Sequence, residues 1–276
     1  MMDITSIAFP IPVADDTNED DYIGEDGLLY CGKCHTPKQC YVPAISDKPM
    51  PCLCRCESEA RDIAERTAKE ERDKMRIERL RASAFPDLTL AFWNFGRDDT
   101  KNKQVSTLSK SYVEQFDDML KAGEGILFYG DVGTGKTFYA CCIANALIDN
   151  GHPCFVTNFT RLVNELFSCT DKQAYIDDLN RYDLLVIDDF GVERNTEYMN
   201  EIVTNVIDAR YVAHKPMIIT TNLSLKELTT PANLEQKRMY SRLLDMCHPV
   251  AVKGDDRRKD NLRERTTEFW KKMGVN

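Results

Sequence analysis

The sequence has no long hydrophobic run, and its start lacks a positive segment followed by an apolar stretch. Secretory signals and membrane spans both need such runs, so we expect a soluble, cytoplasmic protein with no membrane partner. Lysine and arginine are missing from residues 1–30, which hold eight acids. That segment carries most of the net charge of −9, so the rest of the chain is nearly neutral. The overall acidity therefore says little about partners.

The length of 276 residues allows one full α/β domain and a smaller module. Residues 1–27 are acidic and contain prolines, and we expect them to form a flexible tail. A cysteine-rich module is expected over residues 28–58. Residues 59–84 are dense in charges of both signs and predict a solvated linker helix. The α/β domain is expected over residues 85–276.

Six of the eleven cysteines fall within the small module. In an intracellular chain such a cluster favours metal ligation over disulfides. A C-x-x-C pair followed by C-x-C-x-C predicts a tetrahedral zinc site with Cys31, Cys34, Cys52 and Cys54 as ligands and Cys56 as the alternative. A disulfide or thiol switch and an iron–sulfur cluster are the competing interpretations. We expect the module to act through its surface, by binding either protein or nucleic acid.

Short apolar runs alternate with helix-length segments in the second half of the chain. The expected strands are residues 125–130, 154–159, 184–190, 217–223 and 250–254. The expected helices are residues 136–149, 160–180 with a break near Thr170, 196–213 and 234–246. This alternation predicts an α/β fold with a parallel five-stranded sheet covered by helices.

The strongest motif is GDVGTGKT, which fits G-x-x-x-x-G-K-[ST] between a predicted strand and a predicted helix. Its residues are Gly130, Asp131, Val132, Gly133, Thr134, Gly135, Lys136 and Thr137. The glycines let backbone N–H groups turn toward phosphate oxygens at a helix N-terminus. Lys136 is expected to reach the β- and γ-phosphates of ATP, and Thr137 to ligate Mg²⁺.

Polar side chains follow two further strands of the predicted sheet. Asp188 and Asp189 end the run LLVIDDF, and Asn222 ends MIITTNL. We expect Asp188 to hold Mg²⁺ and Asp189 to orient the attacking water. Asn222 could contact the γ-phosphate, because ligands bind at the carboxyl ends of parallel strands. Taken alone, an asparagine in this position is a common turn residue.

A pair of arginines occurs near the C-terminus in KRMYSRLL. Arg238 and Arg242 are four residues apart, so they share one face of the predicted helix. Taken alone, this pattern indicates two charged residues on the solvent-exposed surface of a helix.

Together, the phosphate loop, the paired aspartates, TTN, RMYSR and KGDDRR resemble the motifs of AAA+ ATPases, over roughly residues 85–265. Within that superfamily the chain resembles bacterial and phage helicase loaders of the DnaC/DnaI type, which are related to IstB-type transposition helper ATPases. The resemblance implies a P-loop AAA+ fold, ATP hydrolysis, self-association, and loading of the replicative hexameric helicase onto single-stranded DNA. Asp189 departs from the glutamate of many members, which implies slow turnover.

The resemblance also assigns roles to single residues. Asn222 would be the sensor-1 residue, and Arg242 the arginine finger with Arg238 beside it. Arg257 or Arg258 would be the sensor-2 arginine. The cysteine module would dock on the helicase.

Single-stranded DNA is expected to meet the second strand of the sheet and the helix after it. Phe159, Arg161 and Lys172 are the candidate contacts. Phe159 could equally belong to the core, and Arg161 to the surface. Two alternatives to a loader stay open: an IstB-like transposition helper, and an ATP-binding adaptor without significant hydrolysis.

Overall fold

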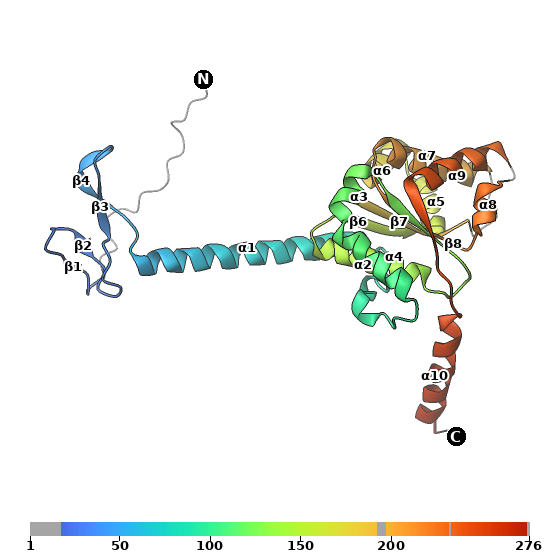
Figure 1. Ribbon diagram of the computed structural model, residues 1–276, viewed down its shortest axis with the longest axis horizontal. Coiled ribbons are helices and arrows are strands. Elements are labelled where there is room, and N and C mark those ends of the chain that lie inside the picture. Colours follow the sequence, from blue (N-terminus) through green and yellow to red (C-terminus); the bar gives the residue numbers. More distant parts are fainter. Residues whose placement is uncertain (1–17, 192–196, 232, 275–276) are drawn as a thin grey trace. The chain divides into compact units, whose positions relative to one another are not determined.

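The chain folds as two compact units, Met1–Lys74 and Met75–Asn276, in a computed structural model (Figure 1). The boundary lies inside a long helix, α1 (Arg55–Ala84), so that both units share this helix. None of the described helices is long and apolar enough to span a membrane. The residues that the structure describes are 18–191, 197–231 and 233–274.

The first unit consists of two antiparallel two-stranded sheets and the beginning of α1. These are β1 (Tyr22–Ile23) with β2 (Leu29–Tyr30), and β3 (Gln39–Val42) with β4 (Ser46–Pro51). Buried Lys38 joins them to the helix, because its ammonium lies 2.9 Å from carboxylate oxygens of both Asp21 and Glu57. The folded module thus begins before residue 28, which corrects the expected end of the acidic tail. Residues 1–17 of that tail lie outside the described part of the chain.

Helix α1 corresponds to the expected charged linker but starts at Arg55, four residues before the expected start. Ala84 is its only buried residue, in keeping with a composition of alternating charges. The helix ends before Phe85 and Pro86, because a residue that precedes proline is disfavoured in the helical conformation. Near this end, Arg81 donates a hydrogen bond to Asn145 at 2.9 Å and thereby fixes the last turn to the second unit.

A five-stranded parallel sheet forms the centre of the second unit. Its strands are β5 (Gly125–Tyr129), β6 (Cys154–Asn158), β7 (Leu184–Phe190), β8 (Met217–Thr221) and β9 (Cys247–Ala251). They lie in the order β6-β7-β8-β5-β9. The chain leaves β5 in the interior of the sheet and returns at its edge, and such a reversal of strand order places a ligand crevice at the carboxyl end of β5. The predicted fold class is confirmed.

Strand β9 starts three residues earlier than expected, at Cys247 instead of residue 250. It lies at the edge of the sheet, where it pairs with β5. An edge strand need not be apolar and tolerates proline, so His248 and Pro249 fit there although no apolar run marks them.

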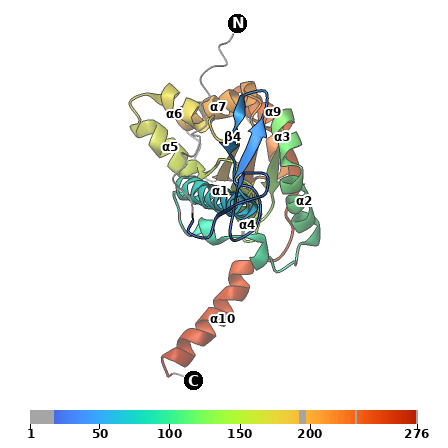
Figure 2. The ribbon, with the colours of Figure 1, turned by 90° about the vertical axis from the view of Figure 1, so that its left-hand side faces the viewer.

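Helices cover both faces of the sheet (Figures 1 and 2). Successive side chains of a strand point to opposite faces, so that Leu184 and Val186 pack into one layer and Leu185 and Ile187 into the other. The first layer is formed by α2 (Lys103–Glu114), α3 (Phe116–Ala122) and α4 (Lys136–Asp149). The second is formed by α5 (Phe159–Ser168), α6 (Lys172–Leu179), α7 (Glu197–Val212) and α9 (Leu234–Met246).

Two further helices belong to the second unit: the short α8 (Leu225–Thr229) precedes α9, and α10 (Arg257–Lys272) follows β9. The expected break near Thr170 is present between α5 and α6. Helices α2, α3, α8 and α10 were not expected.

Candidate functional site

The phosphate loop connects β5 to α4 through three glycines with positive φ. Gly130, Gly133 and Gly135 have φ of 142°, 82° and 103°, values that side chains with a Cβ rarely adopt. Space is a second constraint at Gly133, where a Cβ would lie 1.8 Å from a carboxylate oxygen of Asp256. This conformation places the loop at the N-terminus of α4, where backbone N–H groups bind anions.

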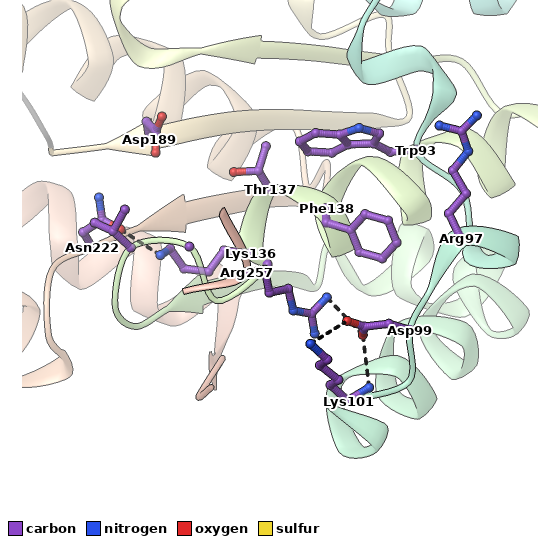
Figure 3. A pocket seen from close by; sticks show the side chains of 13 residues that line it. Trp93, Arg97, Asp99, Lys101, Lys136, Thr137, Phe138, Asp189, Asn222 and Arg257 are labelled. Atoms are coloured by element: carbon purple, nitrogen blue, oxygen red, sulfur yellow. Dashed lines mark hydrogen bonds and ion pairs between the residues drawn. The ribbon is translucent and has the colours of Figure 1, made fainter. Parts of the chain in front are cut away.

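Lys136 is held inside this loop with 6% of its surface exposed. Its ammonium donates to the carbonyl oxygens of Gly130 at 2.9 Å and Asp131 at 2.8 Å, and to Oδ1 of Asn222 at 2.7 Å. The structure thus brings the lysine of the loop and the asparagine after β8 into direct contact (Figure 3).

The two aspartates at the end of β7 have different environments. Asp188 is buried, and burial raises the pKa of its carboxyl group, while hydrogen bonds from Thr220 and Thr137 act in the opposite direction. Asp189 is exposed and faces the cavity beside the loop, with φ of 53° in the left-handed region. The register of β7 against β8 shifts at this point. The adjacent carboxylates are therefore separated into a buried and an exposed one.

Thr220 of β8 links these two aspartates through one hydroxyl group. Its Oγ1 donates to Asp188 Oδ1 at 2.5 Å and accepts the backbone N–H of Asp189 at 3.0 Å. One side chain therefore orients the buried carboxylate and supports the left-handed backbone of its neighbour. Thr220 was not predicted from the sequence as a site residue, although it is the first threonine of TTN.

We expect Thr220→Val to lower ATP turnover about 10- to 100-fold, the usual effect of removing a group that orients a metal ligand. Thr220→Ser keeps the hydroxyl and should retain turnover within about threefold of the original protein. Steady-state hydrolysis at saturating ATP measures the effect. Equal rates for the valine and serine variants would show that the hydroxyl has no such role.

A cavity of about 660 Å³ lies beside the phosphate loop (Figure 3). Arg257 reaches it from the start of α10: its backbone N–H donates to Gly133 at 3.1 Å, and its guanidinium lies 3.4 Å from Asp99. The side chain of Arg258, the other sensor-2 candidate, lies outside the described residues. Several lining residues were not singled out from the sequence, namely Trp93, Arg97, Asp99, Lys101 and Phe138.

Arg238 and Arg242 of α9 do not line this cavity in the described part of the chain. Arg242 forms an ion pair with Asp208 of α7, with 42% of its side chain exposed, and it lines a separate open hollow. Arg238 is exposed. Within one chain, neither arginine is brought to the nucleotide site.

The candidate DNA contacts separate into one buried and two exposed residues. Phe159 is 3% exposed and packs edge-on against Phe190 at 5.8 Å, so the expectation that its ring stacks on DNA bases is wrong. Phe159 is the first residue of α5 and shares the buried face of this helix with Leu162 and Val163 at helical spacing. Arg161 is exposed and paired with Glu165 at 2.7 Å, and Lys172 is exposed at the start of α6.

Four thiols of the first unit, from Cys31, Cys34, Cys54 and Cys56, lie within 4.8 Å of one another. The sulfur atoms of Cys54 and Cys56 are 3.3 Å apart, and those of Cys31 and Cys56 are 3.6 Å apart. Tetrahedral zinc with bonds of about 2.3 Å places its thiolates about 3.8 Å apart, so this cluster fits the metal.

Cys52, one of the four expected ligands, points elsewhere. Its thiol lies 3.7 Å from the carbonyl oxygen of Pro37 and is absent from the cluster. The backbone N–H of Cys52 donates to the carbonyl oxygen of Lys38 at 2.8 Å, so Cys52 continues the antiparallel pairing of β3 with β4. Cys54 and Cys56 lie where the chain turns into α1. The candidate set is corrected by replacing Cys52 with Cys56.

We expect Cys56→Ser to lose bound zinc and the fold of the small module, because a module of this size derives most of its folding free energy from the metal. Cys52→Ser is the matched control and should keep about one zinc ion per chain. Elemental analysis measures the metal, and protease resistance of the module reports its fold. Zinc loss in the Cys52 variant and retention in the Cys56 variant would reverse the assignment.

Comparison with known proteins places most of the chain in one family. Residues 60–265 match the family described as IstB-like ATP binding protein. The replicative helicase loader DnaC of Escherichia coli K12 is 31% identical over 133 residues, which are 46% of this chain and 53% of that protein. The loader DnaI of Bacillus subtilis is 27% identical over 169 residues, covering 56% of this chain and 53% of that protein. The chain spans about half the length of these relatives.

A crystal structure of DnaI has the same fold. It superposes with a TM-score of 0.54 at 20% identity and covers 65% of this chain and 99% of that one. The strand order, the loop geometry and the family match agree. The protein therefore belongs to the IstB-like ATP binding proteins and is a DnaC-like member of the AAA+ ATPases.

Proposed function

We propose that the protein binds and hydrolyses ATP and loads a replicative hexameric helicase onto single-stranded DNA. The observation that best supports ATP binding and hydrolysis is the hydrogen bond between Lys136, in the loop after β5, and Asn222, at the carboxyl end of β8. Support for the loading role comes from relatives that are named replicative helicase loaders.

Binding of ATP would use groups that already point at one place. The N–H groups of the loop would hold the phosphates at the start of α4, and Lys136 would exchange its carbonyl partners for β- and γ-phosphate oxygens. Thr137 and Asp188 would hold Mg²⁺, which neutralises phosphate charge when bound. Arg257 would approach the γ-phosphate from the start of α10, because its backbone N–H is hydrogen-bonded to the carbonyl oxygen of Gly133 in the loop.

Hydrolysis would depend on Asp189, the exposed carboxylate at the cavity. In this position it can accept a hydrogen bond from the attacking water. Aspartate is one methylene shorter than glutamate, which supports slow turnover suited to a switch. Arg242 is remote from the cavity of its own chain, so we propose that it serves the site of a neighbouring subunit in a self-associated form.

The cysteine-rich module and the AAA+ domain would have different roles. The exposed apolar side chains of the module, which suit a protein partner, are Tyr22, Ile23, Tyr41, Ile45 and Leu53. We propose that this surface docks on the helicase while the AAA+ domain handles ATP and DNA.

A transposition helper is the second candidate, because the matching family is named for IstB-like proteins. Such a protein would act on a transposase instead of a helicase. An adaptor that binds ATP without hydrolysing it is the third, and it predicts no turnover even with DNA and partner present.

The test is a loading assay with the purified replicative helicase of the host and closed circular single-stranded DNA. We expect this protein and ATP together to raise the amount of helicase that remains on the circles after gel filtration. Recovery of a transposase but no helicase from host lysate would favour the second candidate.

A further inference from the structure

The end of helix α10 exposes two aromatic rings side by side. Phe269 is 51% exposed, Trp270 49% and Met273 60%. The two rings are in edge contact, with centroids 5.5 Å apart. All described residues from Thr266 to Gly274 are exposed, and beyond its first residue, which contacts the phosphate loop, the helix extends away from the sheet and its covering helices (Figure 2).

The net charge of α10 is positive, whereas that of the whole chain is negative. α10 contains seven lysines and arginines and three acids, whereas the whole chain carries −9. Lys271 and Lys272 directly follow the two rings. Exposed aromatic rings next to lysines are the combination that binds single-stranded nucleic acid, because bases stack on the rings and phosphates pair with the ammonium groups.

Other occupants fit this surface less well. A helix that lies in a membrane surface needs a continuous apolar face, but α10 has only three large apolar residues, Leu262, Phe269 and Trp270, in its 16. A helix that pairs with a second copy needs an apolar repeat every three to four residues, which α10 lacks. Exposed aromatic rings among basic residues are better suited to single-stranded nucleic acid, which is a polyanion with flat bases.

We propose that Phe269, Trp270, Lys271 and Lys272 form a stacking site for single-stranded nucleic acid. This inference deepens the DNA contact of the proposed function and rests on that function for its biological role. It also supplies the stacking rings that buried Phe159 cannot provide.

The first test is the affinity for a fluorescently labelled oligothymidylate, measured by anisotropy without ATP or helicase. Trp270→Ala should weaken binding about 5- to 100-fold, the effect of removing one stacking ring. Trp270→Phe keeps a ring and should lie within about threefold of the original protein. Met273→Ala is the matched control, an equally exposed apolar change that should have no effect. Unchanged affinity in Trp270→Ala would overturn the proposal.

Two further measurements identify the contact and the ligand. The chain has two tryptophans, so Trp93→Phe leaves Trp270 as the only reporter, and oligothymidylate should quench its fluorescence. Lys271→Gln with Lys272→Gln should reduce the dependence of log K on log salt by about 1.4. A Trp270 response to anionic lipid vesicles, or to protein concentration alone, without a response to oligothymidylate would contradict the proposal. The binding measurements contain no helicase, so a failure of the helicase-loading assay would not contradict the stacking site. Equally, a failure of oligothymidylate binding at α10 would not contradict helicase loading.

Discussion

Arg242→Ala is expected to lower partner-stimulated ATP hydrolysis by about 10³-fold or more while ATP affinity stays within about twofold. An arginine supplied by a neighbouring subunit stabilises the charge that develops on the transferred phosphoryl group. Arg242 does not line the cavity beside the phosphate loop of its own chain, so its loss should leave ATP binding unchanged. The surface ion pair with Asp208 contributes at most about 1 kcal/mol, so the variant should fold.

Two matched variants separate this role from a structural one. Asp208→Asn releases the guanidinium of Arg242 and should keep or raise the stimulated rate. Arg238→Ala removes a charge from the same helix and should cost less than Arg242→Ala. Full activity in an Arg242→Ala protein that sedimentation shows to be monomeric would refute the arrangement between subunits.

Lys136→Ala is expected to abolish ATP binding at millimolar concentrations. The buried ammonium of Lys136 donates to two carbonyl oxygens at the start of the loop, those of Gly130 and Asp131, and to the side chain of Asn222. Its removal would deprive the phosphates of the cation that the loop holds and would leave three oxygen acceptors without that donor. Isothermal titration with a slowly hydrolysed ATP analogue measures the loss.

Thermal unfolding provides the control for folding of this variant. A ligand at about 100 times its Kd stabilises a protein by about 2.7 kcal/mol, so ATP should raise the Tm of the original protein. Lys136→Ala should unfold cooperatively but show no ATP-dependent rise. Lys121→Ala, an exposed change paired with Asp118, should behave like the original protein. A normal rise in the Lys136 variant would contradict our placement of the phosphates.

Motifs with fixed spacing could be located from the sequence because their chemistry requires neighbours along the chain. Lys136 of the phosphate loop and Asp188 at a strand end are of this kind. The fold class followed from apolar runs, since buried parallel strands must be apolar on both faces. Strand β9 was predicted from residue 250, and its first three residues, Cys247 to Pro249, were missed because β9 is an edge strand that contains a proline.

Features that depend on tertiary packing could not be found in this way. Trp93, Arg97 and Asp99 line the cavity from a segment without a motif, and only the fold brings them to the loop. Thr220 matters through two hydrogen bonds across strands, which no local pattern indicates. The choice between Cys52 and Cys56 depended on where the chain turns into α1, and spacing alone did not distinguish them.

The loading of a replicative helicase onto closed circular single-stranded DNA tests the central claim most directly. We predict that the original protein with ATP will increase the helicase retained on the circles, and that Lys136→Ala and Cys56→Ser will each fail, the first for lack of ATP and the second for lack of the docking module. An unchanged amount of retained helicase with the original protein, under conditions where it binds ATP and its zinc module is intact, would contradict the account.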